Sequence, residues 1–346
     1  MLSVAQIASG GATADLIFGP DGGPVLPLLA VDADSAAGLP AATVRRAAEL
    51  LAAALPVRVV LGGRLAVPPA LAQVADVCLT GALADQPGSA GGEDPLAALA
   101  RLEQRVGAAP RAALTLVWLL RGTGQLDVTQ ALAAESAAYS TLLAGPEFAA
   151  WLHGRGAARP AGPPAPRVEV RRDGGTLRIV LARPARRNAF DAMMRDALLA
   201  ALDIAAADPE LRVEITGQGP DFCAGGDLDE FGSTPDAATA HVIRCAASAG
   251  AALHAVRDQT TVRVHGASFG AGVEITAFAG RVIATPDARF CLPELGMGLI
   301  PGAGGTVSVS RRVGRLRAGW LALSGEVIDA ATALRWGLVD ELSSAH

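Results

Sequence analysis

The segment 264–306 constrains the fold most, because a strand pattern there runs into a glycine turn and then into an apolar helix. β-Branched residues dominate 260–264, and Gly270 and Gly272 precede the apolar run that carries Glu274. Backbone N–H groups at the start of a helix have no partner inside the helix, and the helix dipole adds partial positive charge there. The segment therefore predicts a turn that can hold an oxygen atom on which negative charge develops.

A second carboxylate follows in the same segment, at Glu294 in the sequence Leu-Pro-Glu-Leu-Gly. Small and apolar residues surround both Glu274 and Glu294. Burial disfavours a charged carboxylate and so raises its pKa towards neutrality. Two such glutamates are suited to general acid and base catalysis.

Four motifs occur in an order that resembles the enoyl-CoA hydratase/isomerase (crotonase) superfamily. They are LARPARRNAFD, GPDFCAGGDL, GASFGAGVEI and RFCLPELGMGLIPGAGGT. The resemblance extends from about Val168 to Leu342, which is the second half of the chain. It implies an α/β fold with a crotonase-like β-β-α superhelix core, preceded here by an N-terminal α/β and helical domain.

The resemblance also implies roles in catalysis for four residues. The backbone N–H groups of Ala224 and Ala271 would polarise the thioester carbonyl. Many relatives have glycine where this chain has Ala271, so a Cβ is expected beside the thioester. Relatives with glutamate at both Glu274 and Glu294 are typically hydratases, in which one carboxylate deprotonates water and the other delivers a proton to Cα.

In the superfamily, two loops lie along the CoA nucleotide. Arginines in the first loop are candidates for phosphate binding because a guanidinium can bind phosphate through two hydrogen bonds. A solvated charged turn is the alternative for any one of them. The predicted CoA-binding residues are Arg183, Arg186, Arg187, Ala224, Gly225, Gly226, Asp227 and Leu228.

The expected activity is that of a lyase in fatty acid metabolism, which hydrates a 2-enoyl-CoA to a 3-hydroxyacyl-CoA. No cofactor is expected, since the CoA thioester is the substrate. Other crotonase-type reactions are alternatives: enoyl-CoA isomerisation, acyl-CoA hydrolysis, or a cofactor-independent dioxygenation of an aryl-acetyl-CoA. A non-catalytic CoA-binding subunit is a further alternative. The acyl group cannot be read from the sequence.

A proline-rich stretch at 155–166 predicts a linker between a domain at 1–154 and a catalytic domain at 167–346. The pattern at 41–55 predicts a helix and that at 57–61 a strand. This order is similar to that of the second half, so the N-terminal domain is interpreted as a degenerate crotonase-like unit. Three further helices are predicted, at Asp94–Val106, Arg111–Leu120 and Asp127–His153, and the aromatic residues of the last, Tyr139, Phe148 and Trp151, are read as a packing face.

Superfamily members typically continue beyond the segment Gly337-Leu338-Val339-Asp340 in helices that cover the acyl site and build trimers. Few residues follow that segment here. The three predicted helices are therefore expected to serve as a lid, on their own subunit or on a neighbour in a homo-oligomer such as a trimer or hexamer. The alternative is an independent domain on a tether.

The composition narrows the possible partners. All 29 basic residues are arginine and the formal net charge is -5, which disfavours nucleic acid binding and excludes Schiff-base chemistry on lysine. The longest apolar run, at 112–120, is too short to cross a bilayer, so a cytoplasmic protein is expected. The cysteines are too widely spaced for a predicted metal site or disulfide; they are Cys78, Cys223, Cys245 and Cys291.

One charged pair departs from the usual apolar residues of the superfamily. Glu214 lies three residues before Gly217, and Arg263 lies three before Gly266. The two strands are neighbours in the superfamily's sheet. We predict that the two side chains bond each other and that both are buried.

Overall fold

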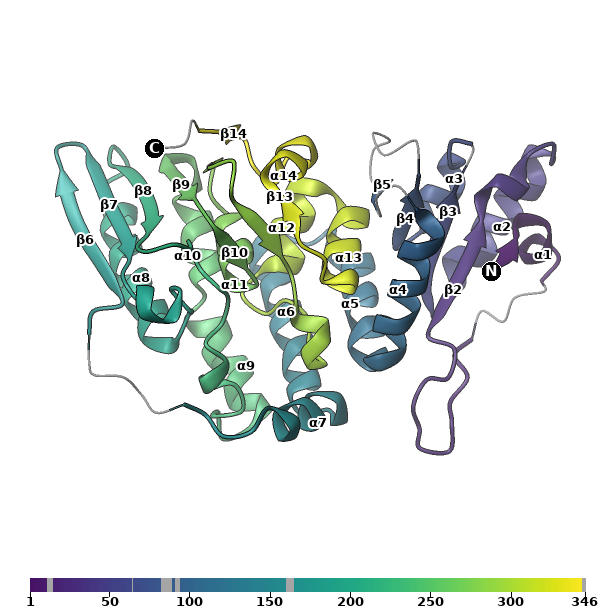
Figure 1. The fold of residues 1–346 in the computed structure, drawn as a ribbon, viewed down its shortest axis with the longest axis horizontal. Helices are drawn as coiled ribbons and strands as arrows, with labels where there is room; N and C mark the ends of the chain where they lie inside the picture. Colours follow the sequence, from purple (N-terminus) through teal and green to yellow (C-terminus); the bar gives the residue numbers. More distant parts are fainter. Residues whose placement is uncertain (11–14, 64, 82–88, 91–93, 160–164, 344–346) are drawn as a thin grey trace. The chain divides into compact units, whose positions relative to one another are not determined.

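The computed structural model describes residues 1–10, 15–63, 65–81, 89–90, 94–159 and 165–343 (Figure 1). The chain forms two compact units. Unit 1 contains Met1–Gly122 and Gly314–Ser324, and unit 2 contains Thr123–Val313 and Gly325–His346. In the part of the chain described, no helix is long and apolar enough to cross a membrane.

Unit 1 is built on a parallel sheet whose strands follow one another in chain order. β3 and β4 are buried along their whole length, in keeping with sequences that are apolar apart from Arg58 and Thr80. The strands are β1 (Leu2–Ser3), β2 (Leu28–Asp32), β3 (Val57–Gly62), β4 (Val77–Thr80) and β5 (Ser89–Ala90). The helices are α1 (Val4–Ala8), α2 (Ala41–Ala53), α3 (Pro69–Val74), α4 (Pro95–Ala108), α5 (Pro110–Thr123) and α13 (Arg315–Ser324).

A buried aspartate joins three elements of unit 1. Asp76 accepts a hydrogen bond from the backbone N–H of Arg58 at 2.8 Å. Its carboxylate also forms ion pairs with the guanidinium groups of Arg58 on β3, Arg121 on α5 and Arg315 on α13. Arg315 further donates to the carbonyl oxygen of Ala75 at 2.6 Å. The helix α13, which lies far along the sequence, is thereby bound to the N-terminal sheet.

Unit 2 contains a six-stranded sheet with the order β14-β11-β9-β8-β7-β6 and a three-stranded sheet with the order β10-β12-β13. All neighbours in the larger sheet are parallel except β6 and β7. The predicted α/β class with a parallel sheet is confirmed. The strands are β6 (Val168–Asp173), β7 (Thr176–Leu181), β8 (Arg212–Gly217), β9 (Thr260–Val264), β10 (Ala267–Phe269), β11 (Arg281–Ala284), β12 (Arg289–Cys291), β13 (Ile328–Asp329) and β14 (Glu341–Leu342).

The helices of unit 2 begin at the side chains that cap them: aspartate or serine precedes five of them. The predicted helix at 127–153 is two helices, because Gly145 and Pro146 interrupt it and Pro146 starts the second. The helices are α6 (Val128–Leu143), α7 (Pro146–Arg155), α8 (Ala192–Ala207), α9 (Ala237–Ala246), α10 (Ala249–Ala255), α11 (Ala271–Thr276), α12 (Gly305–Val313) and α14 (Ala330–Trp336), with a short 3-10 helix η5 (Glu294–Met297).

The compact units divide the chain at a different place from the predicted linker. The proline-rich stretch 155–166 joins two parts of unit 2, and its residues 160–164 lie outside the described part. Helices α6 and α7 belong to unit 2 because α6 packs on α9, α10 and α12, and α7 packs on η5. Prolines mark where a helix cannot continue, whereas the division into units follows side-chain packing.

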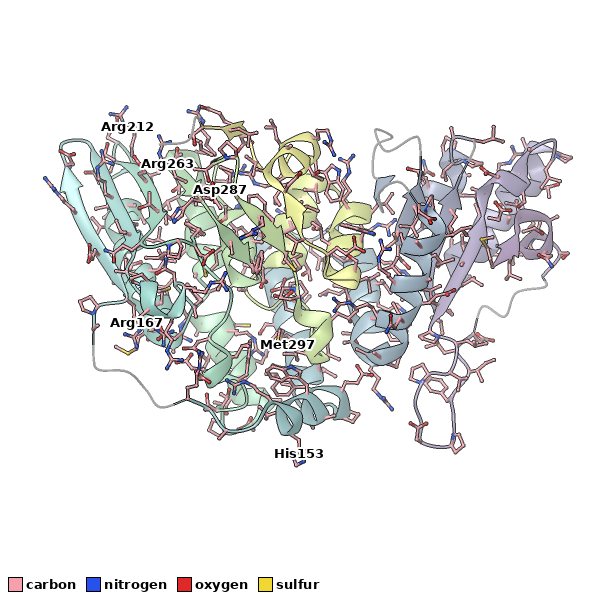
Figure 2. All side chains as sticks on the ribbon, viewed as in Figure 1. His153, Arg167, Arg212, Arg263, Asp287 and Met297 are labelled. Carbon is pink, nitrogen blue, oxygen red and sulfur yellow. The ribbon has the colours of Figure 1, made fainter. Side chains whose placement is uncertain are left out.

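The predicted bond between Glu214 on β8 and Arg263 on β9 is confirmed. The prediction that both side chains are buried is wrong. Arg263 Nε lies 2.9 Å from Glu214 Oε1, and Arg178 on β7 lies 3.3 Å from the same carboxylate. The side chains of Arg263 and Glu214 are 46% and 23% exposed. Figure 2 labels Arg263 among the side chains of this sheet. The sheet face that carries these residues is in contact with water, so a charge there needs no partner.

Candidate active site

A cavity of about 420 Å³ in unit 2 brings together the predicted site residues other than Arg183, Arg186 and Arg187, which do not line it. Glu274 comes from α11 and Glu294 from η5. Leu228 and the segment 224–227 line another part of the wall. Ala271 lies at the start of α11 and faces the same space.

The turn before α11 needs glycine for two reasons. Gly270 has φ +47° and ψ -120°, a conformation that a side chain strongly disfavours. A Cβ on Gly270 would also lie 2.6 Å from Oε1 of Glu294. The turn starts the helix and leaves the N–H of Ala271 without an acceptor in the described part of the chain. The predicted role of this N–H as a donor to a ligand stays a prediction.

The second predicted donor needs a correction. The N–H of Ala224 donates to the carbonyl oxygen of Arg187 at 2.9 Å, so it is not free. Gly226, two residues further along the chain, also lines the cavity and is an alternative donor. Phe190 forms a parallel β-bridge with this segment: its N–H donates to the Gly225 carbonyl, and its carbonyl accepts from the N–H of Asp227. Among the residues described, nothing accepts from the Gly226 N–H, which lies on the opposite side of this extended segment.

Glu274 is held by the backbone that starts α12. Its Oε2 accepts hydrogen bonds from the N–H groups of Ala303 at 2.7 Å and Gly305 at 2.9 Å. A Cβ on Gly305 would lie 2.7 Å from Cγ of Glu274, so the loop approaches this side chain closely. Burial raises the pKa of Glu274 to about 7, and the backbone donors limit the rise.

Glu294 is held differently, because a backbone hydrogen bond from its own residue is the one that opposes the rise in its pKa. Its Oε2 is buried and has no hydrogen-bond partner among the described residues. Burial, followed by the negative charge of Glu274, raises the pKa of Glu294 well above its usual value. The two carboxyl groups thus differ: the donors around Glu274 favour its ionised form, and the surroundings of Glu294 favour its protonated form.

The three predicted phosphate-binding arginines are each engaged by a carboxylate of the protein. Arg183 lies 2.7 Å from Asp227, Arg186 lies 3.0 Å from Asp229, and Arg187 lies 2.6 Å from Asp221. The side chain of Arg187 is 55% exposed, whereas that of Arg183 is 14% exposed. Of the three, Arg187 is therefore the one most accessible to an added phosphate.

Cys223 lies next to the cavity wall. Its thiol is buried, and burial raises its pKa to about 12. A thiol with such a pKa carries almost no thiolate at neutral pH and is a poor nucleophile. None of the four cysteines, all of which lie in the described part of the chain, forms a disulfide, and Cys245 is exposed.

The sequence interpretation expected the helix at 127–153, now α6 and α7, to form part of a lid over the acyl site, but it missed that aromatic residues of this segment face the cavity. Tyr139 and Trp151, which were predicted to form a packing face, both line it. The interpretation holds for Phe148, which is buried and stacks on Trp151 with ring centroids 5.7 Å apart. Tyr139 covers the loop before α12, since a Cβ on Gly302 would meet its ring at 2.4 Å.

Two charged residues beside the cavity were also missed. Arg244 on α9 borders both this cavity and an adjoining one of about 280 Å³, which Glu135 on α6 also lines. Glu135 occupies a position at which the helical period of the buried residues Val128, Ala131, Tyr139 and Leu142 calls for an apolar side chain. A carboxylate in such a stripe was the signal that could have identified it.

Comparisons with known proteins relate the second half of this chain to one family. Residues 171–346 match the family model described as enoyl-CoA hydratase/isomerase. The 2,3-dehydroadipyl-CoA hydratase of Escherichia coli is 38% identical over 174 residues, which cover 50% of this chain and 68% of that protein. A probable enoyl-CoA hydratase of Mycobacterium tuberculosis is 34% identical over 181 residues, 51% of this chain and 69% of that protein. A solved enoyl-CoA hydratase from Thermoplasma volcanium aligns with a TM-score of 0.48 and 34% identity over 52% of this chain and 72% of its own.

Proposed function

Because this chain belongs to the enoyl-CoA hydratase/isomerase family, we propose that it adds water across the Cα=Cβ bond of a 2-enoyl-CoA. The product is a 3-hydroxyacyl-CoA. Water supplies the hydroxyl group at Cβ, and one proton is added at Cα, so the reaction needs no oxidant or reductant.

The N–H groups of Gly226 and Ala271 are the proposed donors to the thioester oxygen. Both groups line the same cavity and lack acceptors in the described part of the chain. As water attacks Cβ, negative charge moves onto the thioester oxygen, and fixed donors at that oxygen stabilise it. Loss of one such donor costs about 10²–10³ in rate in comparable sites. The segment 224–228 along the wall supports CoA binding there.

The two glutamates are assigned different roles. Glu274, whose ionised form is favoured by two backbone donors, deprotonates the attacking water. Glu294, whose protonated form is favoured by burial, delivers the proton to Cα. Return of the water proton from Glu274 to Glu294 completes the cycle. The observation that carries the proposal is this pair of unlike carboxyl groups facing one cavity with two free backbone donors.

Hydration of crotonyl-CoA tests the proposal directly. Loss of the enoyl absorbance should be catalysed by the wild-type protein and by Glu210→Gln, which changes an exposed glutamate outside the cavity. It should be nearly abolished in Glu294→Gln, while binding of a saturated acyl-CoA, followed by thermal shift, is retained.

A second substrate distinguishes hydration from isomerisation. If the wild-type protein binds acyl-CoAs but converts only a 3-enoyl-CoA to the 2-enoyl-CoA, the reaction is a proton transfer and the proposal is wrong. Oxygen uptake on an aryl-acetyl-CoA, or thioester hydrolysis without hydration, would contradict it equally.

A further inference from the structure

Glu135 lies outside the segment that matches the family, yet it is part of the site in unit 2. It comes from α6, and 2% of it is exposed. Its Oε1 accepts from the N–H of Gly304 at 2.7 Å. Its Oε2 accepts from the N–H of Thr306 at 2.9 Å and from the hydroxyl of Thr306 at 2.6 Å.

These contacts alternate with those of Glu274. The N–H groups of Ala303 and Gly305 donate to Glu274, and those of Gly304 and Thr306 donate to Glu135. Four successive N–H groups at the start of α12 are thus shared between two carboxylates from two different helices. Helix N-termini favour negative charge, and this opposes the burial that raises the pKa of both carboxyl groups.

The same backbone is confined by packing. Gly304 has φ +109°, and a Cβ there would meet the ring of Phe278 at 2.4 Å. The loop therefore has little freedom while Glu135 holds it. Without Glu135, two buried N–H groups would lose their acceptor, and the backbone that orients Glu274 would shift to satisfy them.

We propose that Glu135 is a positioning residue for the reaction assigned above: it fixes the start of α12 so that Glu274 is correctly aimed, and, when it is ionised, it places a second negative charge near Glu294. This rests on the proposed function. The charged or titratable groups that face Glu135 are Glu274 on α11, Glu294 on η5, Arg244 on α9 and Tyr139 on α6.

The charge of Glu135 is expected to change the pKa of Glu294 in a definite direction. The negative charge of Glu135 is one of the causes that raise the pKa of Glu294. Replacing Glu135 by glutamine removes this charge, so the pKa of Glu294 should fall. Since Glu294 must be protonated to act, the alkaline limb of the kcat profile should move to lower pH.

The test compares Glu135→Gln with the wild type and with the exposed control Glu210→Gln. We expect kcat to fall about 10–100-fold, because small displacements of a reacting group have effects of this size. KM should change little, and the alkaline limb should move to lower pH. A variant that is less stable but keeps the wild-type kcat and pH profile would show that Glu135 is only structural and would overturn the proposal.

A second pair of variants covers the case in which Glu135→Gln does not fold. Thr306→Val removes one donor to Glu135, whereas Thr306→Ser keeps it. The valine variant should lose more activity than the serine variant, and equal losses would contradict the positioning role.

Infrared titration of the buried carboxyl groups separates this proposal from the proposed function. It requires no turnover. An apparent pKa that is lower in Glu135→Gln than in the wild type supports the electrostatic role even if crotonyl-CoA is not hydrated. If the wild-type protein hydrates crotonyl-CoA but the apparent pKa is the same in Glu135→Gln and the wild type, the electrostatic role is overturned and the hydratase function stands.

Discussion

Two clusters of buried charge, one in each unit, hold their carboxylates in opposite ways. In unit 1, the single carboxylate of Asp76 is surrounded by the guanidinium groups of Arg58, Arg121 and Arg315. In unit 2, Glu135, Glu274 and Glu294 are all buried, and in the described part none forms an ion pair with an arginine. Backbone N–H groups hold two of them, and one oxygen of Glu294 has no partner.

The surroundings of a buried carboxylate decide whether it stabilises the fold or can take part in proton transfer. A carboxylate surrounded by arginines stays ionised and joins elements, which is what Asp76 does for β3, α5 and α13. A buried carboxylate that lacks a cation has a raised pKa and can exchange a proton near neutral pH. The cluster in unit 2 is of the second kind, and it lies at a cavity.

The largest expected effect is the loss of activity when the cluster in unit 2 is broken. Glu274→Gln and Glu294→Gln should each lower kcat for hydration by about 10²–10⁴, because an amide cannot exchange the proton. Their effects on stability should differ. Glu274→Gln disturbs two backbone donors, whereas Glu294→Gln removes a carboxyl oxygen that has no partner. Calorimetry should therefore show a lower Tm only for Glu274→Gln, and equal Tm losses would contradict this asymmetry.

The second prediction concerns Asp76. Asp76→Asn should destabilise unit 1 by about 3–5 kcal/mol, since it leaves buried guanidinium groups without their carboxylate. Hydrogen exchange in peptides from β3 and α5 should accelerate. Asp208→Asn is a matched control, because Asp208 pairs with Arg172 at 3.0 Å at an exposed site. A change in Asp76→Asn no larger than that in the control would show that the arginines find other partners.

The contrast between the units also explains what the sequence could predict. Glu274 and Glu294 were identifiable because local motifs, glycines and apolar neighbours surround each of them. The strand predicted at 57–61 was identifiable from its mostly apolar, β-branched residues. Local patterns of this kind record the conformation of a few successive residues.

Pairs of side chains that are far apart in the sequence could not be predicted from such local patterns. Nothing near Asp76 indicates Arg315, which is more than two hundred residues away in the sequence. Glu135 and Thr306 lie 171 residues apart, and nothing near either one indicates the other. The assignment of the free donor failed for a related reason: whether the Ala224 N–H is free depends on the position of the Arg187 carbonyl, which is set by the fold of a distant loop.

The third prediction uses pH to sharpen the comparison. The folded-state pKa values of Glu274 and Glu135 are raised to about 7 and about 8, above the usual carboxyl value of about 4.3 in unfolded chains. A raised carboxyl pKa stabilises the fold fully below the unfolded value, and this contribution is lost as pH rises through the folded value. The stability of unit 2 should thus fall between about pH 5 and 8, by an amount on the order of a few kcal/mol.

Hydrogen exchange of peptides from α6 and α12, measured at several pH values and corrected for the intrinsic exchange rate, checks this. Glu135→Gln should flatten the dependence because it removes one of the titrating groups. A wild-type stability of these helices that is constant or increases over the range would contradict the assignment of raised pKa values.

The smallest expected effect concerns the exposed pair of Glu214 and Arg263. The two atoms lie 2.9 Å apart, but water screens them, and such pairs contribute about 0.2–1 kcal/mol. Arg263→Met should therefore destabilise only slightly, and a double-mutant cycle with Glu214→Leu should give a coupling within that range. Arg178, which also pairs with Glu214, would take over part of the interaction and lower the coupling further. A coupling above about 2 kcal/mol would mean that the pair is desolvated in the protein in solution. It would then resemble Asp76 and its arginines rather than an ordinary surface ion pair.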